Sequence, residues 1–357
     1  MIEGIVPAFV VGVSLLGIRK REDTEYLSNS QGAIIKGISS ILLVIIHIRE
    51  RLESIPLAYK ILAAGGFLLV SLFFFYSGYG ITKRIMNNKE YINIGLPRRI
   101  CYLIALIVSS ETVYYLFETL LFHKKVQFSD LILCIVGVNM LNSVCWTIVA
   151  MIVIQIVMWF CFKIGVRRSS LSAIIGCAVY MIISLMRRRA AWEIQSCAAF
   201  AFGSLCAEDE NRVIDYLENR TRIIFCATVL FMSFSLPYFY EYLFSKDSYA
   251  IRIISGTISS ITFLISFFFV LYRFSINNCI VRLLGRISTE VYIWHGLIID
   301  IMKKQLYAPI CRICGGGGET ATIFFSLICI VGVILFSIIK VTIQNQISNK
   351  LLVTAKQ

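Results

Sequence analysis

The sequence is poor in charge, proline and long polar stretches. Charged residues make up 15% of its 357 residues, well below the roughly 25% of soluble domains, whereas hydrophobic residues make up 58%. The longest polar stretch, 207–221, has only the length of a loop. These absences exclude a soluble globular protein, and the apolar runs that recur along the chain indicate a polytopic helical membrane protein. Weak alternation of polar and apolar residues argues against an outer-membrane barrel.

Motifs for soluble nucleotide binding and for metal binding are also missing. The sequence has no P-loop, no Rossmann glycine pattern and no HExxH. Most of its 12 cysteines fall inside apolar runs, where cysteine acts as a small buried residue. Cys311 and Cys314 form a CxxC, but a zinc site needs a second pair of ligands, so a loop disulfide is the more plausible alternative. We expect no metal and no tightly bound cofactor.

The net charge of +13 does not indicate nucleic-acid binding. The lysines and arginines stand in short clusters between apolar runs, which is where membrane proteins place them on the cytosolic side. We therefore expect membrane lipid, and not nucleic acid, to surround this protein.

The apolar runs predict an all-α transmembrane bundle of about 10 core helices plus one extra N-terminal helix. The expected runs are 5–18, 33–52, 61–82, 100–121, 130–142, 145–163, 170–186, 194–207, 222–240, 251–272, 287–303 and 320–342. We expect the short run 130–142 to be re-entrant or interfacial. The expected organisation is an extra N-terminal transmembrane helix and cytosolic linker at 1–32, the main transmembrane domain at 33–345 and a short tail at 346–357.

The charged loops predict an orientation. The segment 83–99 carries five lysines and arginines in a short connection, so we expect it in the cytosol. The run 33–52 then crosses from inside to outside, with Lys36 near the cytosolic face and His47 about two-thirds of the way across. This orientation leaves the basic segment 187–189 outside, as an exception to the positive-inside rule.

Lys36 and His47 form the most unusual polar pattern of the chain. They stand eleven positions apart in KGISSILLVIIH, so on a helix they share one face about 16 Å apart, with Ser40 between them. Polar groups inside a membrane are costly unless they face a polar cavity. A neutral imidazole is the natural general base for a hydroxyl near neutral pH. The alternative is a histidine near a helix end whose ring bonds to a neighbouring carbonyl.

Two further titratable residues lie near the middle of apolar runs. His295 stands about 12 Å into the run that begins at residue 287, so we expect two histidines at mid-membrane depth on different helices. Glu111 lies near the middle of 100–121 and could orient a histidine or bind a cation, but a buried salt bridge is equally plausible. Arg286 and Glu290, four residues apart, are expected to form a structural ion pair.

A group of small and basic residues surrounds the predicted cytosolic loop. Ser77, Gly78 and Tyr79 end the second long run, and small residues there allow either close helix packing or the approach of a ligand. Arg98 and Arg99 open the next helix. Their guanidinium groups suit phosphates, although anionic lipid headgroups would serve as well.

Five segments together resemble the membrane-bound acyltransferase 3 family, bacterial enzymes that O-acylate cell-surface and extracellular glycans. The matching segments are IIKGISSILLVIIH (34–47), GGFLLVSLFFFYSGYGI (65–81), LPRRI (96–100), CWTIVAM (145–151) and GRISTEVYIWHG (285–296). The resemblance implies about ten transmembrane helices and a cytosolic acyl-CoA donor. The family signature, a basic residue followed after ten residues by histidine, falls on Lys36 and His47. Many members have arginine at the first position, so Lys36 is a departure that loses the bidentate guanidinium.

The expected function is that of an integral membrane O-acyltransferase of the bacterial plasma membrane, which moves an acyl group, most plausibly acetyl, to a polysaccharide hydroxyl. Acyl-CoA would be the co-substrate, with its phosphates near Lys36, Arg98 and Arg99. The other residues expected to bind the donor are Ser40, Ser77, Gly78 and Tyr79. His47 would act as general base or carry the acyl group transiently, and His295 would assist it. The main alternative is a transporter or flippase for an anionic or glycan substrate, against which stand the five prolines and the lack of an internal repeat. A third alternative is an inactive membrane scaffold.

Overall fold

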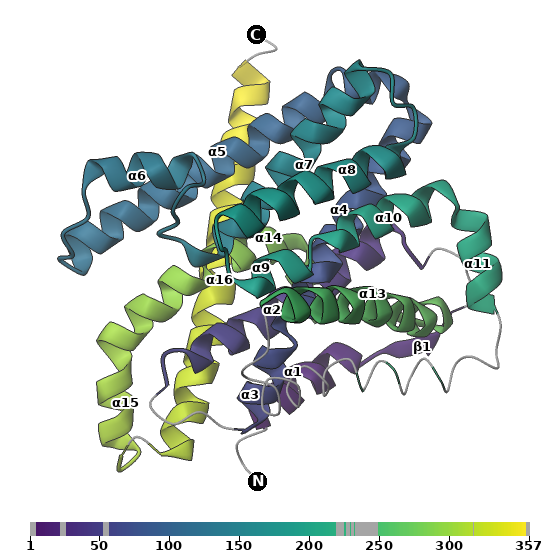
Figure 1. Cartoon of the computed structure of the whole chain (residues 1–357). Helices are drawn as coiled ribbons and strands as arrows, with labels where there is room; N and C mark the ends of the chain where they lie inside the picture. Colours follow the sequence, from purple (N-terminus) through teal and green to yellow (C-terminus); the bar gives the residue numbers. More distant parts are fainter. Residues whose placement is uncertain are drawn as a thin grey trace. The chain divides into compact units, whose positions relative to one another are not determined.

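The computed structural model describes residues 5–21, 26–52, 57–218, 225, 229, 232, 249–316 and 318–354, except for the side chains of 347–354. Its described residues are almost entirely helical (Figure 1). Seven helical segments in this part of the chain are long and apolar enough to cross a membrane: Asn29–Arg49, Leu57–Asn87, Lys89–Leu121, Ser143–Lys163, Ser169–Met186, Tyr249–Arg273 and Glu319–Gln346. The predicted all-α polytopic bundle is therefore confirmed.

The chain divides into two compact units, each with residues from distant parts of the sequence. The terminal unit comprises Met1–Lys20, Leu27–Ala63 and Ser275–Gln357, and the central unit comprises Arg21–Tyr26 and Ala64–Phe274. The elements of the terminal unit are α1 (Ile5–Leu15), β1 (Ile18–Lys20), α2 (Asn29–Arg49), α3 (Leu57–Ala64), β2 (Phe274–Ile276, paired with β1), α14 (Cys279–Met302), η6 (Lys303–Tyr307), α15 (Ala308–Ile313) and α16 (Glu319–Thr354).

In the terminal unit, α2 packs against α14, and α14 packs against α16. Glycines permit the first contact, because a Cβ on Gly37 would lie 2.5 Å from the backbone nitrogen of Gly285. A Cβ on Gly285 would in turn lie 2.9 Å from the carbonyl carbon of Ala33. Close approach at small residues is the usual way in which membrane helices gain packing energy. The two glycines therefore fix α2 and α14 against each other.

The central unit holds α4 (Gly66–Asn87), η2 (Lys89–Ile92), α5 (Gly95–Leu116), η3 (Phe117–Leu121), α6 (Phe128–Ile135), η4 (Ser143–Cys145), α7 (Trp146–Lys163), α8 (Ser169–Met186), α9 (Ala191–Gln195), α10 (Ala198–Glu208), α11 (Glu210–Glu218) and α13 (Tyr249–Arg273). Helix α4 packs along α10, and α7 along α8 (Figure 1). Gly78 and Gly203 allow the first pairing, since a Cβ on either would collide with a backbone carbonyl oxygen of the other helix.

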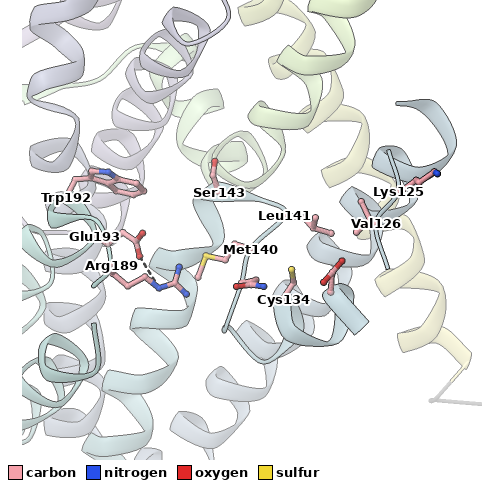
Figure 2. Close-up of a pocket in the computed structure, with 11 residues that line it drawn as sticks. Lys125, Val126, Cys134, Met140, Leu141, Ser143, Arg189, Trp192 and Glu193 are labelled. Carbon is pink, nitrogen blue, oxygen red and sulfur yellow. Dashed lines mark ion pairs between the residues drawn. The ribbon is translucent and has the colours of Figure 1, made fainter. Parts of the chain in front are cut away.

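A cavity of about 560 Å³ lies in the central unit (Figure 2). It is bounded by the segment after α5, by α6, by the turn before α7 and by the segment between α8 and α9. These segments all lie at one end of the long helices α5, α7 and α8.

Several expected helices differ in length from the observed ones. The run 194–207 is broken, because α9 ends at Gln195 and α10 begins at Ala198. Helix α6 has eight residues, about 12 Å, which is too short to cross a bilayer core of about 30 Å by itself. Helix α1 forms in the expected N-terminal run but has only 11 residues. The run 222–240 lies almost wholly outside the described residues.

The remaining sequence expectations on the fold concern a disulfide, the domain boundaries and the orientation. Cys311 and Cys314, for which a disulfide was the more plausible alternative, are both free thiols in the structure. The domain boundaries at residues 32 and 345 stay a prediction, as does the orientation of the chain in the membrane.

Candidate functional site

His47 lies in the last turn of α2, which ends at Arg49. Its Nδ1 lies 3.2 Å from Oε2 of Glu50, the first residue after the helix. Burial alone would raise the pKa of the Glu50 carboxyl, but the hydrogen bond with His47 and the nearby charge of Arg51 hold it below its ordinary value. The ionised carboxylate can only accept, so the proton of a neutral His47 ring resides on Nδ1. The lone pair of the imidazole is therefore on Nε2.

His295 lies on α14 beside His47, with 4.9 Å between the two ring centroids. Its side chain is completely buried. Its Nδ1 lies 3.1 Å from the carbonyl oxygen of Val291, which can only accept, so this ring also carries its proton on Nδ1. Nε2 of His295 is buried and has no hydrogen-bond partner among the described residues. The contact between α2 and α14 thus brings together two imidazoles that both present Nε2 as an acceptor.

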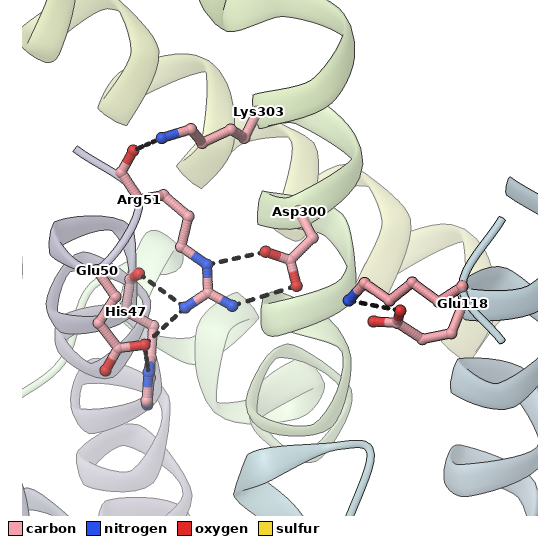
Figure 3. A network of polar contacts seen from close by, with 7 residues as sticks. His47, Glu50, Arg51, Glu118, Asp300 and Lys303 are labelled. Carbon is pink, nitrogen blue, oxygen red and sulfur yellow. Dashed lines mark hydrogen bonds and ion pairs between the residues drawn. The ribbon is translucent and has the colours of Figure 1, made fainter. Parts of the chain in front are cut away.

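Arg51 joins the end of α2 to α14 (Figure 3). Its guanidinium donates from Nε to Oδ1 of Asp300 over 2.9 Å and from a terminal nitrogen to Oδ2 over 3.2 Å. The other terminal nitrogen donates to Oε2 of Glu50 over 2.6 Å. Lys303, in the π-helical turn after α14, donates to the backbone carbonyl of Arg51. The carboxylate that orients His47 is thereby tied to the helix that carries His295.

The sequence analysis did not identify Glu50, Arg51 or Asp300 as site residues. Asp300 offered a signal, since it is a carboxylate inside the apolar run that follows His295. Glu50 offered a weaker one, because charged residues are common just beyond the end of a membrane helix. Only the packing of α2 on α14 shows that these side chains meet.

Lys36 and Ser40 occupy the part of α2 before His47. Ser40 is fully buried, and its hydroxyl donates to the carbonyl of Gly37 over 2.8 Å. The hydroxyl therefore has its hydrogen-bond partner within the same helix. Lys36 is half-buried on the same helix. The shared helix agrees with the predicted stripe, and the proposed contact of Lys36 with an acyl donor stays a prediction.

The expected ion pair between Arg286 and Glu290 is wrong. Glu290 is buried and pairs with Lys340 on α16, and it accepts a 2.8 Å hydrogen bond from Nε1 of Trp294. Arg286 is exposed. The reason is that Glu290 points toward α16, where a lysine from a distant part of the sequence neutralises it.

Glu111 belongs to the central unit and is completely buried on α5. Its Oε2 accepts hydrogen bonds from the backbone N–H groups of Leu141 and Asn142, over 2.9 and 3.3 Å. Asn142 also donates from its side chain to Ser110 Oγ over 2.8 Å. The contacts of Glu111 hold the turn before α7 against α5, which is a structural task. The predicted catalytic role of Glu111 has no support from these contacts and stays a prediction.

The predicted donor-binding group also lies in the central unit. Arg99 donates to Ser77 Oγ over 3.0 Å, and Arg98 is exposed. Tyr79 donates to Glu210 over 2.6 Å, and Lys83 pairs with the same carboxylate. Gly78 is covered by α10, so its role in the structure is helix packing. The structure thus leaves the two arginines as the residues of this group suited to phosphate.

No group of three or more metal-binding side chains occurs among the described residues. No curated protein and no solved structure matches the chain. A family model described as an acyltransferase domain, that of acyltransferase 3, matches residues 33–342. Since this match covers most of the chain, and its described residues include seven candidate membrane spans, the protein belongs to the acyltransferase 3 family and is a multi-pass membrane acyltransferase.

Proposed function

We propose that the protein is an O-acyltransferase of the bacterial plasma membrane. It moves an acyl group from acyl-CoA to a hydroxyl of a cell-surface or exported polysaccharide, and we propose acetyl as that group. The observation that carries this proposal is the pair of imidazoles on α2 and α14, whose ring centroids are 4.9 Å apart. Acyl transfer to a hydroxyl needs a group that removes the hydroxyl proton, and a correctly oriented imidazole is suited to that task.

His47 acts as the general base. Nε2 of His47 takes the proton of the acceptor hydroxyl while the hydroxyl oxygen attacks the carbonyl carbon of the thioester. The bond between that carbon and sulfur then breaks, and the thiolate of coenzyme A takes the proton from His47. In a second version Nε2 attacks the thioester carbon, the carbon–sulfur bond breaks and the thiolate of coenzyme A leaves. The acceptor hydroxyl then attacks the acyl carbon, the bond to Nε2 breaks, and the hydroxyl proton passes to the thiolate. Glu50 orients the ring in both versions, since it holds Nδ1–H.

His295 supports the proton transfer. Its buried Nε2 lacks a hydrogen-bond partner among the described residues, and leaving a buried polar atom unpaired costs about 1–3 kcal/mol. A substrate hydroxyl, or Nε2–H of His47 after it has taken the proton, would supply the missing donor. His295 then stabilises the charged form of His47 that appears during the reaction.

The donor is acyl-CoA, a co-substrate and not a tightly bound cofactor. Its phosphates would contact Lys36, Arg98 and Arg99, because guanidinium and ammonium groups suit phosphate oxygens. Arg98 is exposed, so its guanidinium group is accessible to a phosphate. Arg99 donates to Ser77, which positions its guanidinium group at the start of α5. Gly78 supports this site by packing closely against α10, and Tyr79 supports it by its hydrogen bond to Glu210.

The test is acyl transfer by purified protein with labelled acetyl-CoA, together with mass spectrometry of surface glycan from cells with and without the gene. We expect His47→Ala to lower transfer by about 10²–10⁴-fold, the usual contribution of a general base. The control is His123→Asn, which changes an exposed loop histidine with a φ of 54° that asparagine tolerates. Wild-type transfer by His47→Ala would contradict the mechanism, and glycan transport without any acyl-CoA turnover would favour the transporter.

A further inference from the structure

The cavity of the central unit has an aromatic platform. Trp192 on α9 is 48% exposed, and its ring packs edge-on against the buried Trp146 with 5.5 Å between centroids. Figure 2 shows Trp192, Glu193 and Arg189 on one side of the cavity and Cys134 and Leu141 across it. An exposed indole that is fixed from behind by a second indole presents a rigid apolar surface to the cavity. Such a surface can stack against the apolar face of a ligand.

Polar groups of both signs surround this platform. Arg189 lies 3.9 Å from the carboxylate of Glu193 and donates to the carbonyl oxygens of Gly137 and Val138, over 3.2 and 2.8 Å. Lys125 and Asp130 add one charge of each sign to the lining of the cavity, and Asn139 and Ser143 add neutral polar groups. The charges among the lining residues therefore cancel.

The cavity lies at the opposite end of the central unit from the basic segment 83–99. Helix α7 begins at Trp146 beside the cavity and ends at Lys163, about 27 Å farther along at 1.5 Å per residue. Lys163 donates to Asn93 Oδ1 over 2.9 Å, and Asn93 belongs to that basic segment. If 83–99 faces the cytosol, as its charges predict, the cavity opens on the outer side of the membrane.

This location explains the basic segment 187–189, which the predicted orientation leaves outside the cell. Arg187 and Arg189 both donate to the carbonyl of Gly137, whose φ of 74° places it in a turn. The hydroxyl of Tyr249 donates a hydrogen bond to the backbone carbonyl of Arg189. Arg189 therefore lines the cavity, and Arg187 and Arg189 together hold the turn at Gly137.

We propose that this cavity is the acceptor subsite, and that it binds a neutral sugar ring of the polysaccharide by stacking on Trp192 and by hydrogen bonds to Arg189, Glu193 and Asn139. This inference rests on the proposed function. The balance of charge disfavours a phosphate-bearing ligand such as the acyl donor. The apolar face of a sugar ring fits an indole, and its hydroxyls fit planar polar side chains that both donate and accept. The volume of about 560 Å³ lies within the roughly 300–1,000 Å³ of typical ligand sites.

The first experiment measures binding directly. All four tryptophans lie in the described part of the chain, and Trp192 alone among them is exposed, so acrylamide quenching of the purified protein reports mainly on its ring. The probe is the mixture of oligosaccharides released from the surface polysaccharide of cells that lack the gene. We expect the probe to protect the fluorescence of the wild type and to have no such effect on Trp192→Phe. An absence of protection in the wild type would overturn the proposal, whether or not the protein transfers acyl groups.

The second experiment separates the acceptor from the donor. Trp192→Ala should raise the KM for the oligosaccharide on the order of tenfold or more, because it removes the stacking platform. The slow hydrolysis of acetyl-CoA without acceptor should stay at the wild-type rate. Met186→Ala, a change of an 80% exposed side chain at the same end of α8, is the matched control and should alter neither value. An unchanged acceptor KM in Trp192→Ala, or an equal loss of acetyl-CoA hydrolysis, would contradict the proposal.

These experiments distinguish the inference from the proposed function. Protection of Trp192 without any acyl transfer by the wild type would support the subsite and overturn the acyltransferase assignment to glycan. Acyl transfer to glycan with no protection and no effect of Trp192→Ala would support the proposed function and overturn the subsite.

Discussion

Glu50 and Glu111 are two carboxylates with opposite surroundings, one in each unit. The Glu50 side chain is 44% exposed, and its partners are the side chains of His47 and Arg51. Glu111 is completely buried, and it accepts hydrogen bonds from two backbone N–H groups of the turn before α7. A carboxylate that touches a titratable ring can influence a proton transfer, whereas one that binds backbone amides fixes a turn. The comparison teaches that the role of an acid is set by its neighbours and not by its depth in an apolar helix.

The largest expected effect on this comparison comes from Glu50→Gln. The amide can donate to Nδ1 of His47, which would place the ring proton on Nε2 and remove the lone pair that the reaction needs. We expect kcat to fall on the order of 10²-fold, measured with labelled acetyl-CoA and oligosaccharide acceptor. Glu50→Asp, which keeps the charge, should recover part of the rate. A wild-type kcat for Glu50→Gln would show that the carboxylate does not orient His47.

Arg51→Met should have a smaller effect on the rate and a clear one on stability. The substitution frees Glu50 and leaves Asp300 without its bidentate partner, so we expect kcat to fall roughly tenfold. The side chains of Arg51 and Asp300 are both partly exposed, so we expect the free energy of unfolding to fall by only about 1–2 kcal/mol. Thermal unfolding in detergent would measure this loss.

The control for Arg51 is Asp300→Leu, which removes the same ion pair but keeps the contact of Arg51 with Glu50. It should lower stability by a similar amount and change kcat less. If both variants lose the same activity, Arg51 acts through the packing of α2 on α14 and not through Glu50.

Glu111→Leu should mainly affect stability. It leaves the N–H groups of Leu141 and Asn142 without their acceptor, at a cost of about 1–3 kcal/mol each at most. We expect the unfolding temperature to fall and the kcat of the molecules that remain folded to fall less than in Glu50→Gln. A large loss of kcat with no loss of stability would restore the catalytic prediction for Glu111.

The smallest effect is a difference in pH dependence between Glu50 and Glu193. The pKa of Glu50 is lowered from its ordinary value of 4.5, so its stabilising contribution exists above that pH and is lost as the pH falls through the lowered pKa. Burial raises the pKa of Glu193, although Arg189 opposes the shift, so its contribution is lost as the pH rises through the raised pKa. The free energy of unfolding of Glu50→Gln should therefore fall less than that of the wild type as the pH is lowered. The free energy of unfolding of Glu193→Gln should fall less than that of the wild type as the pH is raised toward neutral. If the free energy of unfolding changes with pH equally in both variants, the two carboxylates do not differ in their surroundings as described.

The sequence predicted much of the fold because a membrane leaves few alternatives for the backbone. Long apolar runs must form helices there, since no water can satisfy open backbone groups. The all-α bundle was therefore predictable and is confirmed, as are the family and the multi-pass arrangement. The break between α9 and α10 was not, because no proline or charge interrupts the run at Ser196 and Cys197.

The candidate site was predictable only in part. The spacing of Lys36 and His47 on one helix and the place of His295 on another follow from the sequence, and the structure brings the two histidines together. The partner of Glu290 was wrongly predicted as Arg286, since spacing within a helix carries no information about Lys340.

By itself, the sequence determined that this protein is a helical membrane acyltransferase of a known family with histidine on two of its helices. Composition and periodicity decide the helical membrane fold, because they depend on the free energy of each segment in lipid. The family follows from the resemblance of the five segments and from the match over residues 33–342. Only the tertiary structure decided that Glu50 touches His47, that Arg51 joins both to Asp300, and that Trp192 faces a cavity. These contacts join residues from different helices or from beyond a helix end, and they depend on which helix faces pack together, for example where Gly37 and Gly285 let α2 meet α14.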